Sequence, residues 1–402
     1  MQSPLQHYIK IALLNLLLVA AIGVILRYKI AFSLPFIDQK NLLHGHSHFA
    51  FAGWITHALM TLLVAFLSAQ KGEAVFKKYR WLINANLFTA YGMLISFPLQ
   101  GYGVYSISFS TLSIFVSYAF AIVYWKDLNS LPEKKISHWW IKAALLFNVL
   151  SSAGAFSLAY MMATKNVHQN WYLAAVYFFL HFQYNGWFLF ACTGLATDKL
   201  LSNVPAVILK RIFWLFAAAC VPAYLLSALW LPIPLWMYVI VVLAAFSQFA
   251  GWILMVQQLK KHLAFIRPAT GSTAQWLLML SAIALSVKLV LQLGSTIPSL
   301  SKISFGFRPI VIGYLHLILL GVITLFLLGF MTAEKHLVLN RASSKGIKMF
   351  TAGIIINELF LMIQGVAAMG YHPVPFINGA LLLAAAIIFS GIILLNISQQ
   401  KT

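Results

Sequence analysis

Histidine is the residue type in this sequence best suited to chemistry, because a neutral imidazole can bind a metal ion. A histidine followed five residues later by a glycine occurs three times in the 402-residue chain. The histidines are separated by 133 and 135 residues, which is close to one third of the chain length. The three copies pair His48 with Gly53, His181 with Gly186 and His316 with Gly321. This spacing predicts three pseudo-repeats, approximately residues 1–134, 135–268 and 269–402.

The first copy contains additional histidines, in the string His44-Gly-His46-Ser-His48. Residues two apart on a helix point about 200° apart, so we expect His46 and His48 on nearly opposite faces, where one helix could serve two metal centres. His44 and His48 are four residues apart and share a face, so His44 could support His48 or replace it as a ligand of one metal centre; alternatively, His44 lies where the helix begins and faces water. His57 is expected about 16 Å deeper than His46, either as a buried hydrogen-bonding residue or as part of a deeper polar path.

The helices that carry these histidines are predicted to cross a membrane. Hydrophobic residues make up 62% of the chain and charged residues 8%, which excludes a soluble globular protein. Continuous apolar runs of about 20 residues indicate helices rather than the alternating strands of a barrel. We therefore predict an all-α polytopic bundle, a single transmembrane domain over residues 1–402, with four helices in each third. The twelve expected spans are 8–27, 44–67, 81–102, 104–125, 139–162, 171–196, 209–230, 233–256, 274–293, 309–331, 347–369 and 374–396.

The net charge of +20 is concentrated in alternate loops. Lys and Arg follow the second, fourth, sixth, eighth and tenth expected spans, as at Lys77, Lys134, Lys210, Lys260 and Lys345. Cationic loops stay on the cytoplasmic side of a membrane, so both termini are expected in the cytoplasm. The distribution indicates lipid, and not nucleic acid, as the partner of this basic chain.

The three repeated histidines are expected at one depth, because the second, sixth and tenth spans run in the same direction. A polar side chain without a partner costs several kcal/mol in hydrocarbon, so each imidazole needs one. A metal ion is one such partner, and hydrogen bonding in the core is the alternative for any single histidine. The glycines would let a planar macrocycle or a neighbouring helix approach closely.

Twelve helices in three groups of four, with histidines on the second, sixth and tenth, resemble subunit I of the heme-copper oxidases and nitric oxide reductases. The string His46-Ser-His48-Phe-Ala-Phe-Ala-Gly53 is similar to the His-x-His-x-x-x-x-Gly helix of nitric oxide reductases. It also resembles the His-x-His-Glu opening of the NnrS family, heme- and copper-containing membrane proteins linked to nitric oxide stress. Gly313-Tyr-Leu-His316-Leu-Ile-Leu-Leu-Gly321 is similar to the later histidine helix of both groups. The double histidine on the second span fits the NnrS family best.

The resemblance implies a heme, of b type, with His316 and either His48 or His46 as axial ligands. The other histidine of that pair would face a second site near His181, where an open iron position could bind a small gas ligand. Arg308, at the outer mouth of the tenth span, would pair with heme propionates or else anchor the helix at the interface. The adjacent histidine pair that completes the copper site of oxidases has no counterpart in the seventh span, so copper is the less expected metal.

The function implied is the handling of nitric oxide or another diatomic gas, or respiratory electron transfer, in a bacterial-type cytoplasmic (inner) membrane. Electrons would come from a quinol or a separate donor protein, because the sequence has no Cys-x-x-Cys-His motif and no nucleotide-binding loop. The alternatives are a heme-binding gas sensor without turnover, an oxidase-like subunit and a twelve-helix secondary transporter. Such transporters are generally built from two-fold repeats, whereas the histidine pattern here is three-fold.

For other polar residues within the expected spans, the sequence leaves two possible roles open. Lys288 and Glu358 fall near mid-span, where they are expected to pair with each other or to mark a proton route. Gln183, Tyr184 and Asn185 follow His181 and could donate to a bound ligand or join neighbouring helices.

Overall fold

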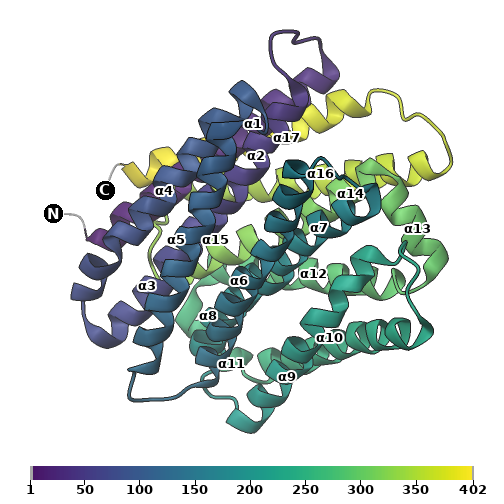
Figure 1. The fold of residues 1–402 in the computed structure, drawn as a ribbon. Coiled ribbons are helices and arrows are strands. Elements are labelled where there is room, and N and C mark those ends of the chain that lie inside the picture. Colours follow the sequence, from purple (N-terminus) through teal and green to yellow (C-terminus); the bar gives the residue numbers. More distant parts are fainter. Residues whose placement is uncertain (1–2, 401–402) are drawn as a thin grey trace. The chain divides into compact units, whose positions relative to one another are not determined.

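In the computed structural model, which describes residues 3–400, the chain is built from helices, without a strand in that range. Side chains are described throughout that range except at residues 269 and 302–305. Eleven of the described helices are long and apolar enough to cross a membrane. The protein is therefore an all-α, multi-pass membrane protein, as its composition predicts (Figure 1).

The chain divides into two compact units, of which unit 1 combines residues 1–122 and 327–402. In unit 1, α1 packs against α2, α3 and α17; α4 packs against α2 and α3; α16 packs along α17. The helices are α1 (Pro4–Ala31), α2 (Gln39–Phe49), η1 (Ala50–Thr56), α3 (His57–Lys71), α4 (Ala74–Gln100), most of α5 (Val104–Asn129), most of α15 (Leu325–Ala333), α16 (Arg341–Met369) and α17 (Ile377–Gln400).

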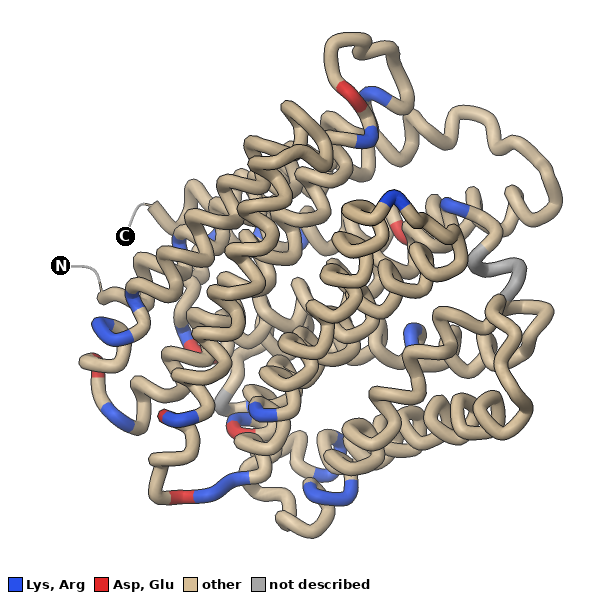
Figure 2. The backbone as a smooth tube through the Cα atoms, viewed as in Figure 1, with Lys and Arg blue, Asp and Glu red and all other residues tan. Residues whose placement is uncertain are grey.

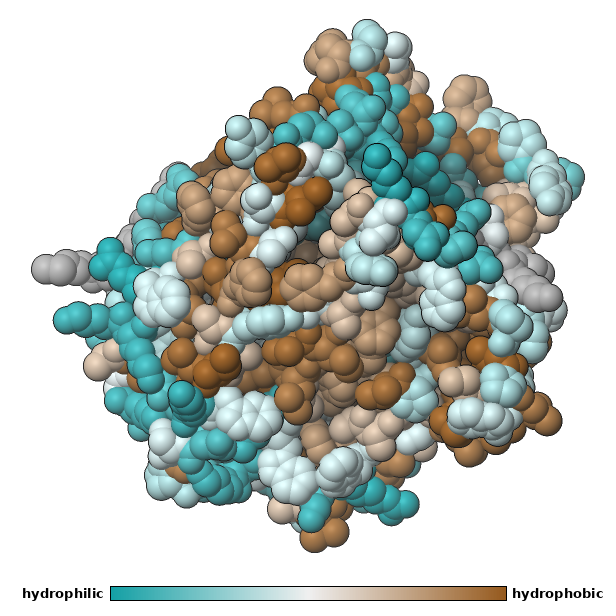
Figure 3. All heavy atoms as spheres, viewed as in Figure 1, coloured by the Kyte–Doolittle hydropathy of each residue, from teal (hydrophilic) through white to brown (hydrophobic). Residues whose placement is uncertain are grey.

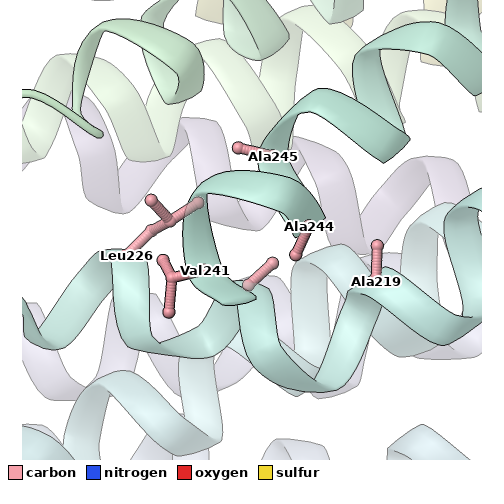
Figure 4. Close-up of a cluster of buried hydrophobic side chains, with 6 residues drawn as sticks. Ala219, Leu226, Val241, Ala244 and Ala245 are labelled. Atoms are coloured by element: carbon pink, nitrogen blue, oxygen red, sulfur yellow. The ribbon is translucent and has the colours of Figure 1, made fainter. Parts of the chain in front are cut away.

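Unit 2 covers residues 123–326. In this unit α6 packs against α7, η2, α8 and α9, while α10 packs against α9 and α12. Small buried residues from α9 and α10, with Leu226 of η3, form one of its apolar clusters (Figure 4). The helices are α6 (Ile136–Ala163), α7 (Gln169–His181), η2 (Phe182–Phe188), α8 (Leu189–Leu200), α9 (Ala206–Ala223), η3 (Tyr224–Ala228), α10 (Leu235–Lys261), α11 (Leu263–Thr270), α12 (Ser272–Gly294), α13 (Pro298–Gly306), α14 (Arg308–His316) and η4 (Leu317–Thr324).

Glycines allow two helices of unit 1 to pack backbone to backbone. A Cβ added at Gly346 of α16 would lie 2.7 Å from the carbonyl oxygen of Gly391 on α17. A Cβ at Gly391 would lie 2.5 Å from the nitrogen of Phe350. Small residues at helix contacts are typical of membrane bundles, where association depends on close packing rather than on the hydrophobic effect.

Charged and apolar residues are distributed as expected for a membrane protein. Lys, Arg, Asp and Glu lie mostly at helix ends and in the connecting loops (Figure 2), and apolar side chains cover broad areas of the visible helix faces (Figure 3). Lys135, which directly precedes α6, forms ion pairs with Asp198, at an N–O distance of 3.6 Å, and with Glu133, at 3.4 Å.

The sixth expected span is present as a helix but is not among the eleven candidate membrane spans. Residues 169–200 form one continuous helical stretch, made of α7, η2 and α8. Its middle contains His181, Gln183 and Asn185, and such polar side chains lower the apolar character of the stretch. The arrangement of twelve membrane helices in three groups therefore stays a prediction.

Candidate functional site

Each of the three repeated histidines is followed by a π-helical segment. His181 and His316 are the last residues of α7 and α14, and η2 and η4 begin at the next residue. After His48 the segment η1 begins two residues later, at Ala50. π-Helical turns are rare and occur frequently at functional sites, because the extra residue per turn disturbs the regular hydrogen bonding of the helix. The sequence motif thus coincides three times with the same unusual backbone.

In unit 1, side chains from two other helices bond the carbonyl groups of η1. Asn15 of α1 donates from Nδ2 to the carbonyl oxygen of Gly53 at 2.6 Å, and Asn86 of α4 donates to that of Ala52 at 3.1 Å. The Tyr91 hydroxyl donates to Oδ1 of Asn15 at 2.6 Å, which fixes the asparagine amide. These bonds satisfy backbone groups that a membrane interior offers no water to satisfy.

Similar support is present in unit 2. The Ser281 hydroxyl of α12 donates to the carbonyl oxygen of Val322 in η4 at 2.7 Å. The Cys220 thiol of α9 donates to the carbonyl oxygen of Asn185 in η2 at the longer distance of 3.9 Å. Hydroxyl, thiol and amide donors therefore stabilise all three π-helical segments from neighbouring helices.

His46 and His48 contact different neighbouring helices, as their spacing predicts. His46 faces α1, where its ring lies 3.6 Å from the position that a Cβ on Gly23 would occupy. Its Nδ1 is buried and forms no hydrogen bond. His48 instead stacks on Phe97 of α4, with ring centroids 4.3 Å apart and an angle of 17° between the planes.

His44 and His48 lie on one face of their helix and contact the same two aromatic rings, those of Phe97 and Tyr102. The His44 ring centroid lies 4.7 Å from that of Tyr102 and 6.1 Å from that of Phe97. The buried Nε2 of His44 forms no hydrogen bond, and His48 forms none with any described residue. Both imidazoles are therefore held by ring contacts, and their nitrogens are available for a further partner.

His57 has a hydrogen-bonding role in the core of unit 1. Its side chain is fully buried, and Nε2 lies 3.1 Å from the carbonyl oxygen of Tyr8. Since a carbonyl only accepts, Nε2 carries the proton. The buried hydrogen-bonding role expected as one alternative is thus observed, and this histidine joins α3 to α1.

His181 uses both of its ring nitrogens within the protein. Nε2 donates to the carbonyl oxygen of Cys220 at 2.8 Å, and Nδ1 accepts from the Asn185 amide at 3.0 Å. Gln183 donates to Asn148 at 2.9 Å and to Ser151 at 2.8 Å, both on α6. These residues therefore join helices, and His181 presents no lone pair to a metal in this arrangement.

His316 has the hydrogen bond that orients many metal-binding histidines. Its Nδ1 donates to the carbonyl oxygen of Ile312 at 2.9 Å, so Nε2 is the nitrogen with the lone pair in the neutral ring. Arg308 lies in the first turn of the same helix and is exposed. The guanidinium therefore lies exposed at the end of the helix, a position compatible with either of its expected roles.

The charges expected near mid-span have partners within their own units. The Lys288 ammonium is buried and donates to Gln292 at 2.5 Å, and Gln292 in turn donates to Gln248 at 2.7 Å. Glu358 accepts a hydrogen bond from the Asn357 amide at 3.1 Å. The sequence analysis did not predict Gln292 and Gln248 as partners of Lys288. Their position as polar residues in apolar helices is the signal that could have identified them.

Heme requires only axial nitrogens, whereas a metal site built from protein alone requires more ligands. Among the described residues no group of three or more His, Cys, Asp or Glu side chains is placed to hold a metal ion. The nitrogens of His44, His46 and His48 described above, and the orientation of His316, fit an iron ligand, and the arrangement of His181 does not.

Comparison with known proteins identifies no family for this chain. No family model matches the sequence, and no curated protein matches it significantly. The functional argument therefore depends on the site itself.

Proposed function

We propose that this protein is a heme-binding membrane protein that carries electrons or binds a diatomic gas. The observation that supports it most is the recurrence of one histidine motif at the start of three π-helical segments. The resemblance of the motif-bearing helices to the NnrS family and to the heme-copper oxidases supports the same function. Copper is a secondary expectation, because an oxidase-type histidine pair is missing.

We assign the iron-binding imidazoles to His48 in unit 1 and His316 in unit 2. His48 has no hydrogen bond to give up within the described residues, and His316 is oriented by Ile312. His46 is the alternative ligand in unit 1, through its unbonded Nδ1. A bound heme would supply reversible one-electron chemistry, and the Arg308 guanidinium matches the carboxylate geometry of a propionate.

His181 is assigned a positioning role in place of the metal role expected for it. Its two hydrogen bonds connect α7 to α9 and to η2, so its ring fixes the start of the π-helical segment. The cytoplasmic membrane, cytoplasmic termini and a quinol or protein electron donor complete the proposal.

Single alanine substitutions of the two assigned ligands test this proposal. His48→Ala and His316→Ala are each expected to lower the heme content of the purified protein or shift its Soret band, because each removes an iron-nitrogen bond. His262→Ala is the matched control, since the only described side-chain hydrogen bond of His262 is to the Gln258 carbonyl and the residue lies outside the motif. Spectra of both ligand variants identical to those of the control would contradict the assignment.

A further inference from the structure

A long part of unit 2 has positive charge without any acidic residue. Residues 199–326 contain nine Lys and Arg residues and no Asp or Glu. Five of the nine lie near the start of α9, at the end of α10 and on α11. They are Lys210, Arg211, Lys260, Lys261 and Arg267, and we call them the basic patch.

The topology of unit 2 brings these five residues to one end of a helix pair. α9 and α10 pack against each other and are joined by residues 224–234, so they run in opposite directions. The start of α9 therefore lies beside the end of α10. α11 follows α10 after a single residue, His262, which places Arg267 at the same end.

The basic patch has no compensating negative charge. All five side chains belong to exposed residues, and none forms an ion pair with a carboxylate of the described residues. The carboxylate that precedes the patch in sequence, Asp198, forms its ion pair with Lys135. Several uncompensated cations at one helix end favour an anionic partner from outside the chain.

Tryptophan and other apolar side chains place the patch at the level of a membrane interface. The Lys210 ammonium lies 5.3 Å from the ring centroid of Trp139, which contacts the ring of Trp214 edge-on at 6.3 Å. Trp214 is 53% exposed, and Leu263 and Phe265 of α11 are 38% and 48% exposed. Tryptophan is enriched where hydrocarbon meets the headgroups, so the cations lie where lipid phosphates are found.

We propose that the basic patch binds the headgroups of anionic phospholipids. The ammonium and guanidinium groups pair with lipid phosphates, while Leu263 and Phe265 of α11 enter the adjoining acyl-chain boundary. A soluble anion would use the cations but not the exposed apolar residues beside them. The presence of both on one short helix therefore favours a lipid surface.

Native mass spectrometry of the full-length protein with defined lipids tests this inference. The protein in detergent is mixed with equal amounts of phosphatidylglycerol and phosphatidylcholine of the same acyl chains, and the bound lipids are counted. We expect a preference for phosphatidylglycerol that falls about tenfold or more when the five patch residues are changed to Gln, because each cation near a lipid surface contributes to binding. The control changes five exposed basic residues of unit 1 to Gln, namely Lys71, Lys77, Lys78, Arg80 and Lys348.

Three outcomes would overturn the inference. Equal loss of preference in the patch variant and the control would show that only net charge matters. Competition by millimolar inorganic phosphate would show that the patch takes a free anion. An unchanged preference for phosphatidylglycerol in the double variant Leu263→Ser, Phe265→Ser would show that the exposed apolar residues of α11 do not contribute to lipid binding.

Discussion

Hydrogen bonding divides the histidines of the repeated motif into two kinds. His181 is bonded through both nitrogens, so its ring is part of the protein core. His48 is held by ring contacts with Phe97 and Tyr102, without a hydrogen bond to a described residue, and His316 is oriented by the hydrogen bond from Nδ1 to its own helix. The sequence shows all three as equivalent, because spacing contains no information on which carbonyl or amide approaches a ring. The second kind is the one that suits iron.

The role assigned to His181 can be tested through its partner. Replacing Asn185 with Leu removes the donor to Nδ1 and leaves a buried nitrogen unpaired. The expected loss of stability is about 1–3 kcal/mol. Thermal unfolding in detergent measures it, with exposed Asn203→Leu as the control. Equal melting temperatures for the two variants would contradict the hydrogen-bonded role.

The three π-helical segments show what could be predicted about the elements and what could not. Apolar runs predicted the existence of the helices, and the recurring His and Gly predicted that three of them are related. The π conformation was not predictable from these patterns, because an apolar run has the same appearance in an α-helix and in a π-helix. Asn15 and Asn86, polar residues in otherwise apolar helices, are the residues that stabilise it in unit 1.

A one-residue deletion tests whether the π-helical geometry positions the histidine. Removing Leu319 from η4 would allow the helix to return to α-helical geometry and would turn His316 by about 100° relative to α15. We expect heme content to fall while helical circular dichroism is retained. Deleting Val167 from the loop between α6 and α7 is the control. Full heme content after deletion of Leu319 would show that the π-helical segment is not needed.

The membrane class of the whole molecule was predictable from composition, and the number of spans was not. Twelve expected spans correspond to eleven candidates and one further helix, formed by residues 169–200. That helix is the one that contains the His181 network. The polar residues that join helices in the core of unit 2 also lower the mean hydropathy of this helix. The residues that hold the core together therefore make the helix harder to recognise as a membrane span from sequence.

The side of the membrane on which the termini lie distinguishes the two numbers of spans. Twelve crossings would place both termini on the same side, and the positions of Lys and Arg in alternate loops predict that this side is the cytoplasm. Eleven crossings would place them on opposite sides. Reporter tags at each end, probed for accessibility in intact cells, measure this directly. We expect both tags to be protected; one accessible tag would contradict the twelve-span topology.

Iron binding by imidazoles of the repeated motif is the central claim for the whole molecule. The most direct measurement is the reduced-minus-oxidised absorption spectrum of the purified wild-type protein, expressed with an ample supply of heme. We predict a Soret band and the α and β bands of a b-type heme, with iron in stoichiometric amount. A spectrum without a Soret band, from protein that is folded by circular dichroism, would contradict the claim.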